Sequence, residues 1–135
     1  VVNMNGMFWS VGMESTSFTL NLGSKFDTSN VTDMGYMFLQ TGRESTVFTL
    51  TLGSKFYTSN VTNMEGMFQA MGEANTNLTL DLRGFDFSNV TLADDMFQYW
   101  DSTHKVYVKN QSDKNFVIAH KGSDSYLQNS NIIIS

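Results

Sequence analysis

The chain repeats itself three times and begins a fourth copy before the pattern ends. The full copies are Val1–Asn30, Val31–Asn60 and Val61–Asn89, and a partial fourth copy covers residues 90–108. A repeat of about 30 residues is typical of proteins that stack one supersecondary unit on the next. Because each unit buries its apolar face only against a neighbouring copy, most repeated residues are expected to serve packing.

The first part of each copy carries apolar residues at a helical spacing. In the third copy, Val61, Met64, Phe68 and Met71 follow one another at intervals of three, four and three positions. This spacing is typical of one face of a short amphipathic helix, and Thr62 lies where its N-terminal cap is expected. A glycine then follows in each copy, where a left-handed residue would end the helix. These glycines are Gly12, Gly42 and Gly72.

The second part of each copy alternates apolar and polar residues, which predicts a strand at residues 18–22, 48–52 and 78–82. Strands and helices that follow one another in the same order give parallel strands, joined by crossovers that are right-handed in about 98% of cases. The apolar residues are expected to face the core, and the polar residues to line an exposed face. We take this face as the candidate ligand-binding surface. Its residues are Thr19, Asn21, Thr49, Thr51, Thr79 and Asp81.

A Ser-Asn pair closes each copy, where the chain must bend into the next. The asparagines are Asn30, Asn60 and Asn89. Short polar side chains at such bends satisfy backbone groups, so we predict a structural ladder of asparagines inside the stack. Each asparagine also begins an Asn-x-Thr sequon, but we interpret these sequons as by-products of the repeat because a buried amide cannot be modified.

The tail departs from the repeat and is expected to cap it. Val106 to Val108 supplies a brief strand, Asp113–Lys121 has the pattern of an amphipathic helix, and Asn131–Ile134 is rich in strand-forming residues. A terminal unit is atypical because its outer face meets water. We therefore divide the chain into a stacked array at residues 1–108 and a cap at residues 109–135.

Composition excludes several classes of function. The net charge of −5, without a cluster of Lys or Arg, gives no electrostatic footprint for nucleic acid. The absence of cysteine removes disulfides and thiolate metal sites. No apolar run approaches the length of a membrane span, so we expect no membrane insertion of this chain. Val1 matches Val31 and Val61 but lacks the preceding Ser-Asn, which leads us to expect further repeats upstream.

We find no catalytic constellation and expect neither a metal nor a cofactor. The methionines recur at one position of the repeat, as in Met34 and Met64, which favours core packing over soft-metal binding. Lone histidines, without a partner at ligand or triad spacing, are interpreted as surface or cap residues. They are His104 and His120. Three aspartates could gather around calcium, but a solvated face of the cap is the stronger interpretation. They are Asp94, Asp95 and Asp101.

The segment Phe26–Phe38 and its copy Phe56–Phe68 carry the string Asn-Val-Thr-x-Met-x-x-Met-Phe. The copy Phe85–Phe97 keeps this string except for Ala93 in place of the first Met. This string resembles the BspA-type repeat of bacterial surface proteins, which is related to leucine-rich repeats. The resemblance covers residues 1–108. It implies an α/β repeat fold, a leucine-rich-repeat-like right-handed β/α solenoid with one short strand and one short helix per repeat, a parallel sheet and a C-terminal cap.

The same resemblance implies an extracellular protein of a bacterial cell surface, without an enzyme's motif, that mediates adhesion to a protein or glycan. The rival hypothesis is a passive spacer, which the even polar face favours. Exposed aromatic side chains would favour a glycan, because sugar rings stack on them. The aromatic candidates are Trp9, Tyr36, Tyr57, Tyr99 and Trp100. We expect a monomer, with a dimer through an open sheet edge as the alternative.

Overall fold

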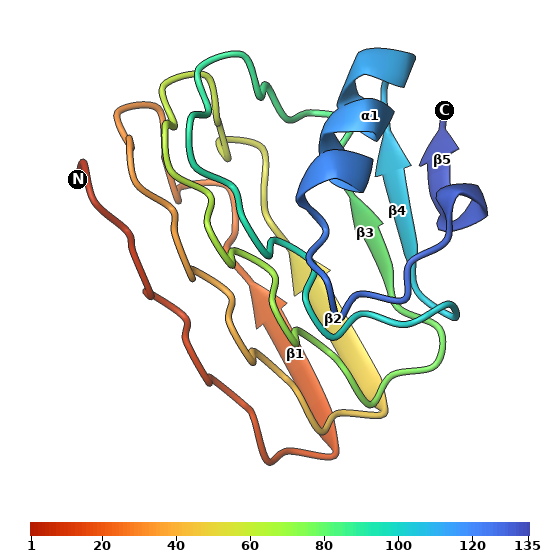
Figure 1. The fold of residues 1–135 in the computed structure, drawn as a ribbon. Helices are drawn as coiled ribbons and strands as arrows, with labels where there is room; N and C mark the ends of the chain where they lie inside the picture. Colours follow the sequence, from red (N-terminus) through yellow and green to blue (C-terminus); the bar gives the residue numbers. More distant parts are fainter.

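The computed structural model describes every residue from Val1 to Ser135. The elements are β1 (Ser17–Asn21), β2 (Val47–Thr51), β3 (Thr79–Asp81), β4 (Lys105–Val108), α1 (Gln111–His120), the 3₁₀ turn η1 (Asn129–Asn131) and β5 (Ile132–Ile134). All strand pairs are parallel, and they form one sheet of β1 and β2 and another of β3, β4 and β5. Figure 1 shows the strands in chain order, with successive repeats side by side.

The expected helix in each repeat is wrong, because these segments form chains of turns. In the second repeat, the amides of Met37 and Leu39 donate to the carbonyl three residues back, at 3.2 Å each. The amides that alternate with them, such as those of Tyr36 and Phe38, donate instead to carbonyls of the third repeat, at 2.7 and 2.9 Å. An α-helix would direct these amides along its own axis, so the turn segments exchange helical bonds for bonds between repeats.

Left-handed residues recur in these turn segments at fixed positions. Gly42 has the positive φ of 57° that the sequence led us to expect, but Tyr36 and Gln40 also have positive φ, at 54° and 58°. Equivalent residues of other repeats behave in the same way, as Ala70 and Tyr99 show with φ of 55° and 68°. A right-handed helix cannot contain left-handed residues every few positions, which is the backbone reason for the missing helices.

The core consists of residues stacked in register from one repeat to the next. One column of phenylalanines runs through it, with ring centroids 5.5 to 5.8 Å apart. Its members are Phe8, Phe38, Phe68 and Phe97. Trp100 closes the column edge-on against Phe97, at 5.1 Å. Methionines surround the column and are fully buried at Met34, Met37, Met64 and Met67. The residues whose spacing predicted the apolar face of a helix are therefore buried, as expected.

Threonine, not asparagine, forms the buried ladder at the bends. Thr28 Oγ1 donates to the carbonyl of Tyr57 at 2.7 Å and accepts from its amide at 2.6 Å. Thr58 repeats this arrangement with Asp86 in the third repeat, at 3.2 and 2.7 Å. Both threonines are at most 2% exposed. The threonine hydroxyl can both donate and accept, so one small side chain satisfies two backbone groups of the next repeat.

Asp86 makes the bend of the third repeat sensitive to acid. Its carboxylate accepts from Ser88, whose side chain and amide lower the pKa of Asp86 below its ordinary value of 3.8. A folded pKa below the unfolded one stabilises the fold above about pH 4, and this stabilisation is lost as the pH falls through the folded pKa. Asp86→Asn keeps the acceptor oxygen but cannot titrate. We expect wild type to lose more stability than Asp86→Asn between about pH 6 and about pH 2, measured by urea unfolding; equal losses would contradict this.

The tail adds a strand to the second sheet, as the sequence suggested. α1 begins at an N-cap, where Asn110 Oδ1 accepts from the amide of Asp113 at 2.8 Å. The chain then returns so that Ile132 of β5 pairs with Val106 of β4. No helix of the chain is both long enough and apolar enough to cross a membrane. The handedness of the crossovers and the leucine-rich-repeat-like class stay predictions.

Candidate functional site: a break in the sheet

The polar residues expected on the strand face are all exposed. Thr19 lies opposite Thr49, and Asn21 lies opposite Thr51, in the register of β1 and β2. In the second sheet, Thr79 and Asp81 are exposed on β3. The structure therefore brings two rows of short polar side chains to the surface, but it divides them between two sheets.

The division leaves one edge of β2 unpaired. In a parallel sheet, the N–H and the C=O of one residue both point to one neighbouring strand. Those of the next residue both point to the strand on the other side. The amide of Leu22 donates to the carbonyl of Thr51 at 2.9 Å, so Thr51 faces β1. Leu50 and Leu52 therefore direct their backbone groups away from β1 and toward β3, to which β2 is not hydrogen-bonded.

The facing edge of β3 is unpaired for the same reason. The amide of Leu82 donates to the carbonyl of Tyr107 at 2.8 Å, so the backbone groups of Leu82 point to β4. By alternation, Thr79 and Asp81 direct their backbone groups toward β2. Two strand edges with free donors and acceptors thus face each other across the break. Such edges are templates for pairing with another chain.

The break is accompanied by a substitution in the loop before β3. In the second repeat, Ser45 Oγ donates to the carbonyl of Ser15 at 2.6 Å and ties the first two repeats together beside β2. Asn75 occupies this position in the third repeat, and its Oδ1 accepts from the amide of Asn77 at 2.7 Å. Its carbonyl oxygen lies 2.6 Å from Nε2 of the buried His104. The loop is still bonded to the second repeat through the Ala74 amide and the Arg43 carbonyl, at 2.9 Å, but Asn75 itself is bonded to its own turn and to the fourth repeat.

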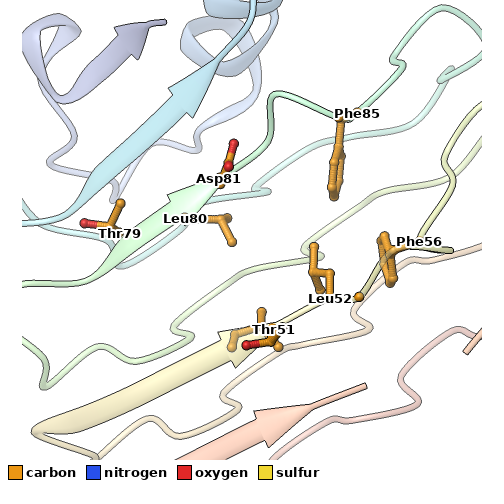
Figure 2. A pocket seen from close by; sticks show the side chains of 10 residues that line it. Thr51, Leu52, Phe56, Thr79, Leu80, Asp81 and Phe85 are labelled. Carbon is orange, nitrogen blue, oxygen red and sulfur yellow. The ribbon is translucent and has the colours of Figure 1, made fainter. Parts of the chain in front are cut away.

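A pocket of about 360 Å³ opens where the strands separate. Figure 2 shows its walls, with Leu52 and Phe56 from the segment after β2 facing Leu80 and Phe85 from the third repeat. The rings of Phe56 and Phe85 are stacked at 5.9 Å. The strand face supplies polar groups to the rim, which are Thr51, Thr79 and Asp81. A pocket that combines apolar walls with polar groups on its rim is typical of a ligand-binding site.

The charges around the pocket are partly compensated. Asp81 accepts two hydrogen bonds from the Arg83 guanidinium, at 2.9 Å each, and this pairing lowers the pKa of Asp81. Lys55 lies in sequence between two lining residues, Gly53 and Phe56, and no carboxylate comes within 4.0 Å of its ammonium. The pocket end of β2 therefore carries a cation without an ion-pair partner.

Residues 1–111 match the model of a protein family described as "Mycoplasma protein of unknown function, DUF285". The chain belongs to this family. DUF285 is a bacterial repeat family, in agreement with the internal repeats of the sequence. No curated protein and no solved structure matches the chain.

The aromatic residues of this DUF285 chain separate into exposed and buried ones. Trp9, Tyr57 and Tyr99 are about half exposed, at 54%, 46% and 45%. Tyr36 is half-buried and stacks on Trp9 at 6.2 Å. Trp100 is fully buried, and its Nε1 donates to the carbonyl of Phe68 at 2.7 Å. It is therefore a core residue and cannot stack on a sugar ring.

The asparagine ladder and the sequons need a correction in this DUF285 chain. Asn30, Asn60 and Asn89 are exposed rather than buried. Nδ2 of Asn60 donates to the carbonyl of Ser29 at 2.7 Å, and Asn89 repeats this bond to Ser59 at 2.6 Å. The asparagines thus link successive repeats on the surface. Burial is no reason to exclude modification at these positions, contrary to our expectation.

The polar residues of the cap lie apart from the pocket. His104 is fully buried, not on the surface, and His120 is half-buried against the ring of Phe116 at 4.3 Å. Asp94 and Asp95 border a polar hollow beside His120. No group of three or more His, Asp or Glu side chains is placed to hold a metal ion.

The pocket was not among the sites expected from the sequence, although two signals point to it. The third repeat has Asn75 where the first two have serine, and its turn after the strand is one residue shorter, with Arg83-Gly84 in place of Gly53-Ser54-Lys55. Both departures lie at the ends of β3. The residues that depart from the repeat therefore indicate the position of this site, whereas the repeated residues do not.

Proposed function

We propose that this DUF285 chain is a non-catalytic binding protein of the bacterial cell surface, which attaches to an extracellular protein, a glycan or another cell. The observation that carries the proposal is the pocket at the break between β2 and β3, on an otherwise even polar face. A chain that only needed to stack would have no reason to open its sheet, because the break leaves backbone donors and acceptors unpaired.

The resemblance of the repeats to those of BspA-type surface proteins supports the extracellular setting. Stacked repeats of this kind present extended surfaces to their partners, and the leucine-rich-repeat-like right-handed solenoid is the fold we propose for the whole array. The short polar residues of the strand face offer hydrogen bonds, and the pocket offers apolar contact area. Both suit the binding of a ligand better than the chemistry of a reaction.

The passive spacer remains the rival proposal, and one observation favours it. Thr19 and Thr49 are the same residue at facing positions of β1 and β2. Such repetition is expected of a surface that only has to stay soluble. A spacer, however, gives no role to the pocket. The two proposals differ in whether the isolated chain binds anything.

A double variant of the strand face tests the proposal. Asn21→Lys with Thr51→Glu places opposite charges at facing positions, one of which lines the pocket, so the fold and the net charge should be kept. Wild type is expected to bind at least one ligand on an array of glycans and extracellular-matrix proteins. The double variant should bind that ligand about tenfold or more weakly, since charged side chains replace the polar contact surface.

The matched control puts the same charges on the turn side of the repeats. Thr32→Lys with Thr62→Glu changes exposed threonines of neighbouring repeats, outside the strands and the pocket lining. It removes their hydroxyl bonds to the preceding repeat, of 3.4 and 3.2 Å, so circular dichroism must first show that the fold is kept. This control should bind like wild type. A folded chain that binds nothing on the array would contradict the proposal and favour the spacer, and equal losses in both variants would contradict the assignment to the strand face.

A further inference from the structure

We infer that the ligand is an extended peptide segment of a partner protein, held at the break between β2 and β3. This inference rests on the proposed binding function and names the ligand class. The peptide places a large apolar side chain in the pocket and lays its backbone beside the unpaired strand edges. The juxtaposition that carries the inference is an apolar pocket between two strand edges whose donors and acceptors are free.

The free backbone groups select a peptide over a glycan. Leu50 and Leu52 on one edge, and Thr79 and Asp81 on the other, present alternating N–H and C=O groups at the spacing of a strand. An extended peptide carries the complementary groups at the same spacing and thereby adds to a sheet edge. A sugar has no such periodic match to the two strand edges.

The pocket selects the side chain that enters it. Leu52, Phe56, Leu80 and Phe85 form apolar walls around about 360 Å³. This space is large enough for a leucine, methionine or phenylalanine side chain, and burial of such a side chain gains free energy in proportion to its apolar area. A polar side chain would gain nothing there. We therefore expect one large apolar residue in the ligand, flanked by strand-forming residues.

The ammonium of Lys55 beside the pocket favours an acidic residue next to the apolar residue of the ligand. Asp81 is neutralised by Arg83, while Lys55 has no carboxylate within 4.0 Å. Asp27 lies within the electrostatic reach of this ammonium, because hydrogen bonds from Ser29 and, in addition, Lys55 lower the pKa of the Asp27 carboxyl. An acidic residue next to the apolar one would complement Lys55. The expected ligand is thus an extended peptide with an apolar residue beside an acidic one.

Gly84 offers a way to fill the pocket without disturbing the core. It lines the pocket, and a Cβ atom added there would meet no atom within 4 Å. Its φ is not positive, so the backbone accepts a side chain. Gly84→Leu therefore places apolar atoms where the ligand's side chain belongs. The matched control is Ser24→Leu, which puts the same side chain on the exposed turn after β1.

The test selects peptides from a random library displayed on phage against the immobilised chain, and titrates fluorescent copies of the enriched peptides against each variant. We expect the enriched peptides to share an apolar residue beside an acidic one. Gly84→Leu should weaken their binding about tenfold or more, Lys55→Gln by a few fold, and Ser24→Leu not at all.

Two outcomes would overturn the inference while leaving the binding function intact. In the first, enriched peptides bind Gly84→Leu as tightly as wild type, which places their site elsewhere. In the second, no peptide is enriched, but a glycan or a matrix protein on the array binds wild type and Gly84→Leu equally. Failure of both the peptide library and the array would contradict the proposed function itself.

Discussion

Alanine in place of Phe68 is expected to lower the free energy of unfolding by about 3–5 kcal/mol. The side chain is fully buried in the middle of the phenylalanine column, where its ring lies 5.8 Å from Phe38 and 5.6 Å from Phe97. Truncation removes the transfer free energy of the ring and leaves a cavity between two repeats. Urea unfolding followed by circular dichroism measures the loss.

Phe8→Ala is the matched control for this prediction. Phe8 ends the same column, stacks on Phe38 at 5.5 Å, and is only partly buried because no repeat precedes it in the structure. Its loss should be at most about half that of Phe68→Ala, since the site can collapse and is already wetted. Equal losses would show that stability does not depend on the stacking of each repeat between two neighbours.

Gly42→Ala is expected to cost about 2–5 kcal/mol, although it adds a single methyl group. Gly42 has φ of 57°, in the left-handed region that penalises a Cβ by about 1–2 kcal/mol. An added Cβ would also collide with the ring of Phe48, which is buried and stacked on Phe18. The ring would have to move, at the usual cost of overpacking of about 1–3 kcal/mol.

Gly84→Ala is the control for the effect of the methyl group alone. Its φ is not positive and its surroundings are open, so its cost should stay within about 1 kcal/mol. Both variants can be compared in the same urea titration. A loss for Gly84→Ala as large as that for Gly42→Ala would mean that any glycine replacement disturbs the array, and that the contact with Phe48 has no special role.

The strands were predictable because alternation reports directly on a face. Phe48, Leu50 and Leu52 point inward while Thr49 and Thr51 are exposed, as the period of two requires. The expected helices failed because apolar spacing reports which residues are buried and not where the amides bond. Met34 and Phe38 are buried in the turn segment as they would be in a helix. The bonds to the next repeat decided the conformation, and no single repeat contains that information.

The candidate site was predictable only in part. The exposure of Thr19 and Thr49 follows from the alternation of the strands. The break between β2 and β3 coincides with Asn75, whose carbonyl oxygen is held by His104, 29 residues away. The sequence shows that Asn75 departs from the repeat, but it cannot show that its groups turn away from the second repeat. The pocket walls looked like ordinary core residues because they are core residues in every other repeat.

Amide hydrogen exchange of the free chain, resolved by residue with NMR, tests the break in the sheet most directly. β2 supplies its own control, because the amides of Thr49 and Thr51 face β1 while those of Leu50 and Leu52 face the break. We predict that the amides of Leu50, Leu52 and Thr79 exchange much faster than those of Thr49 and Thr51. Equal protection of both sets would contradict the break, because a continuous sheet would leave no free strand edges for a peptide.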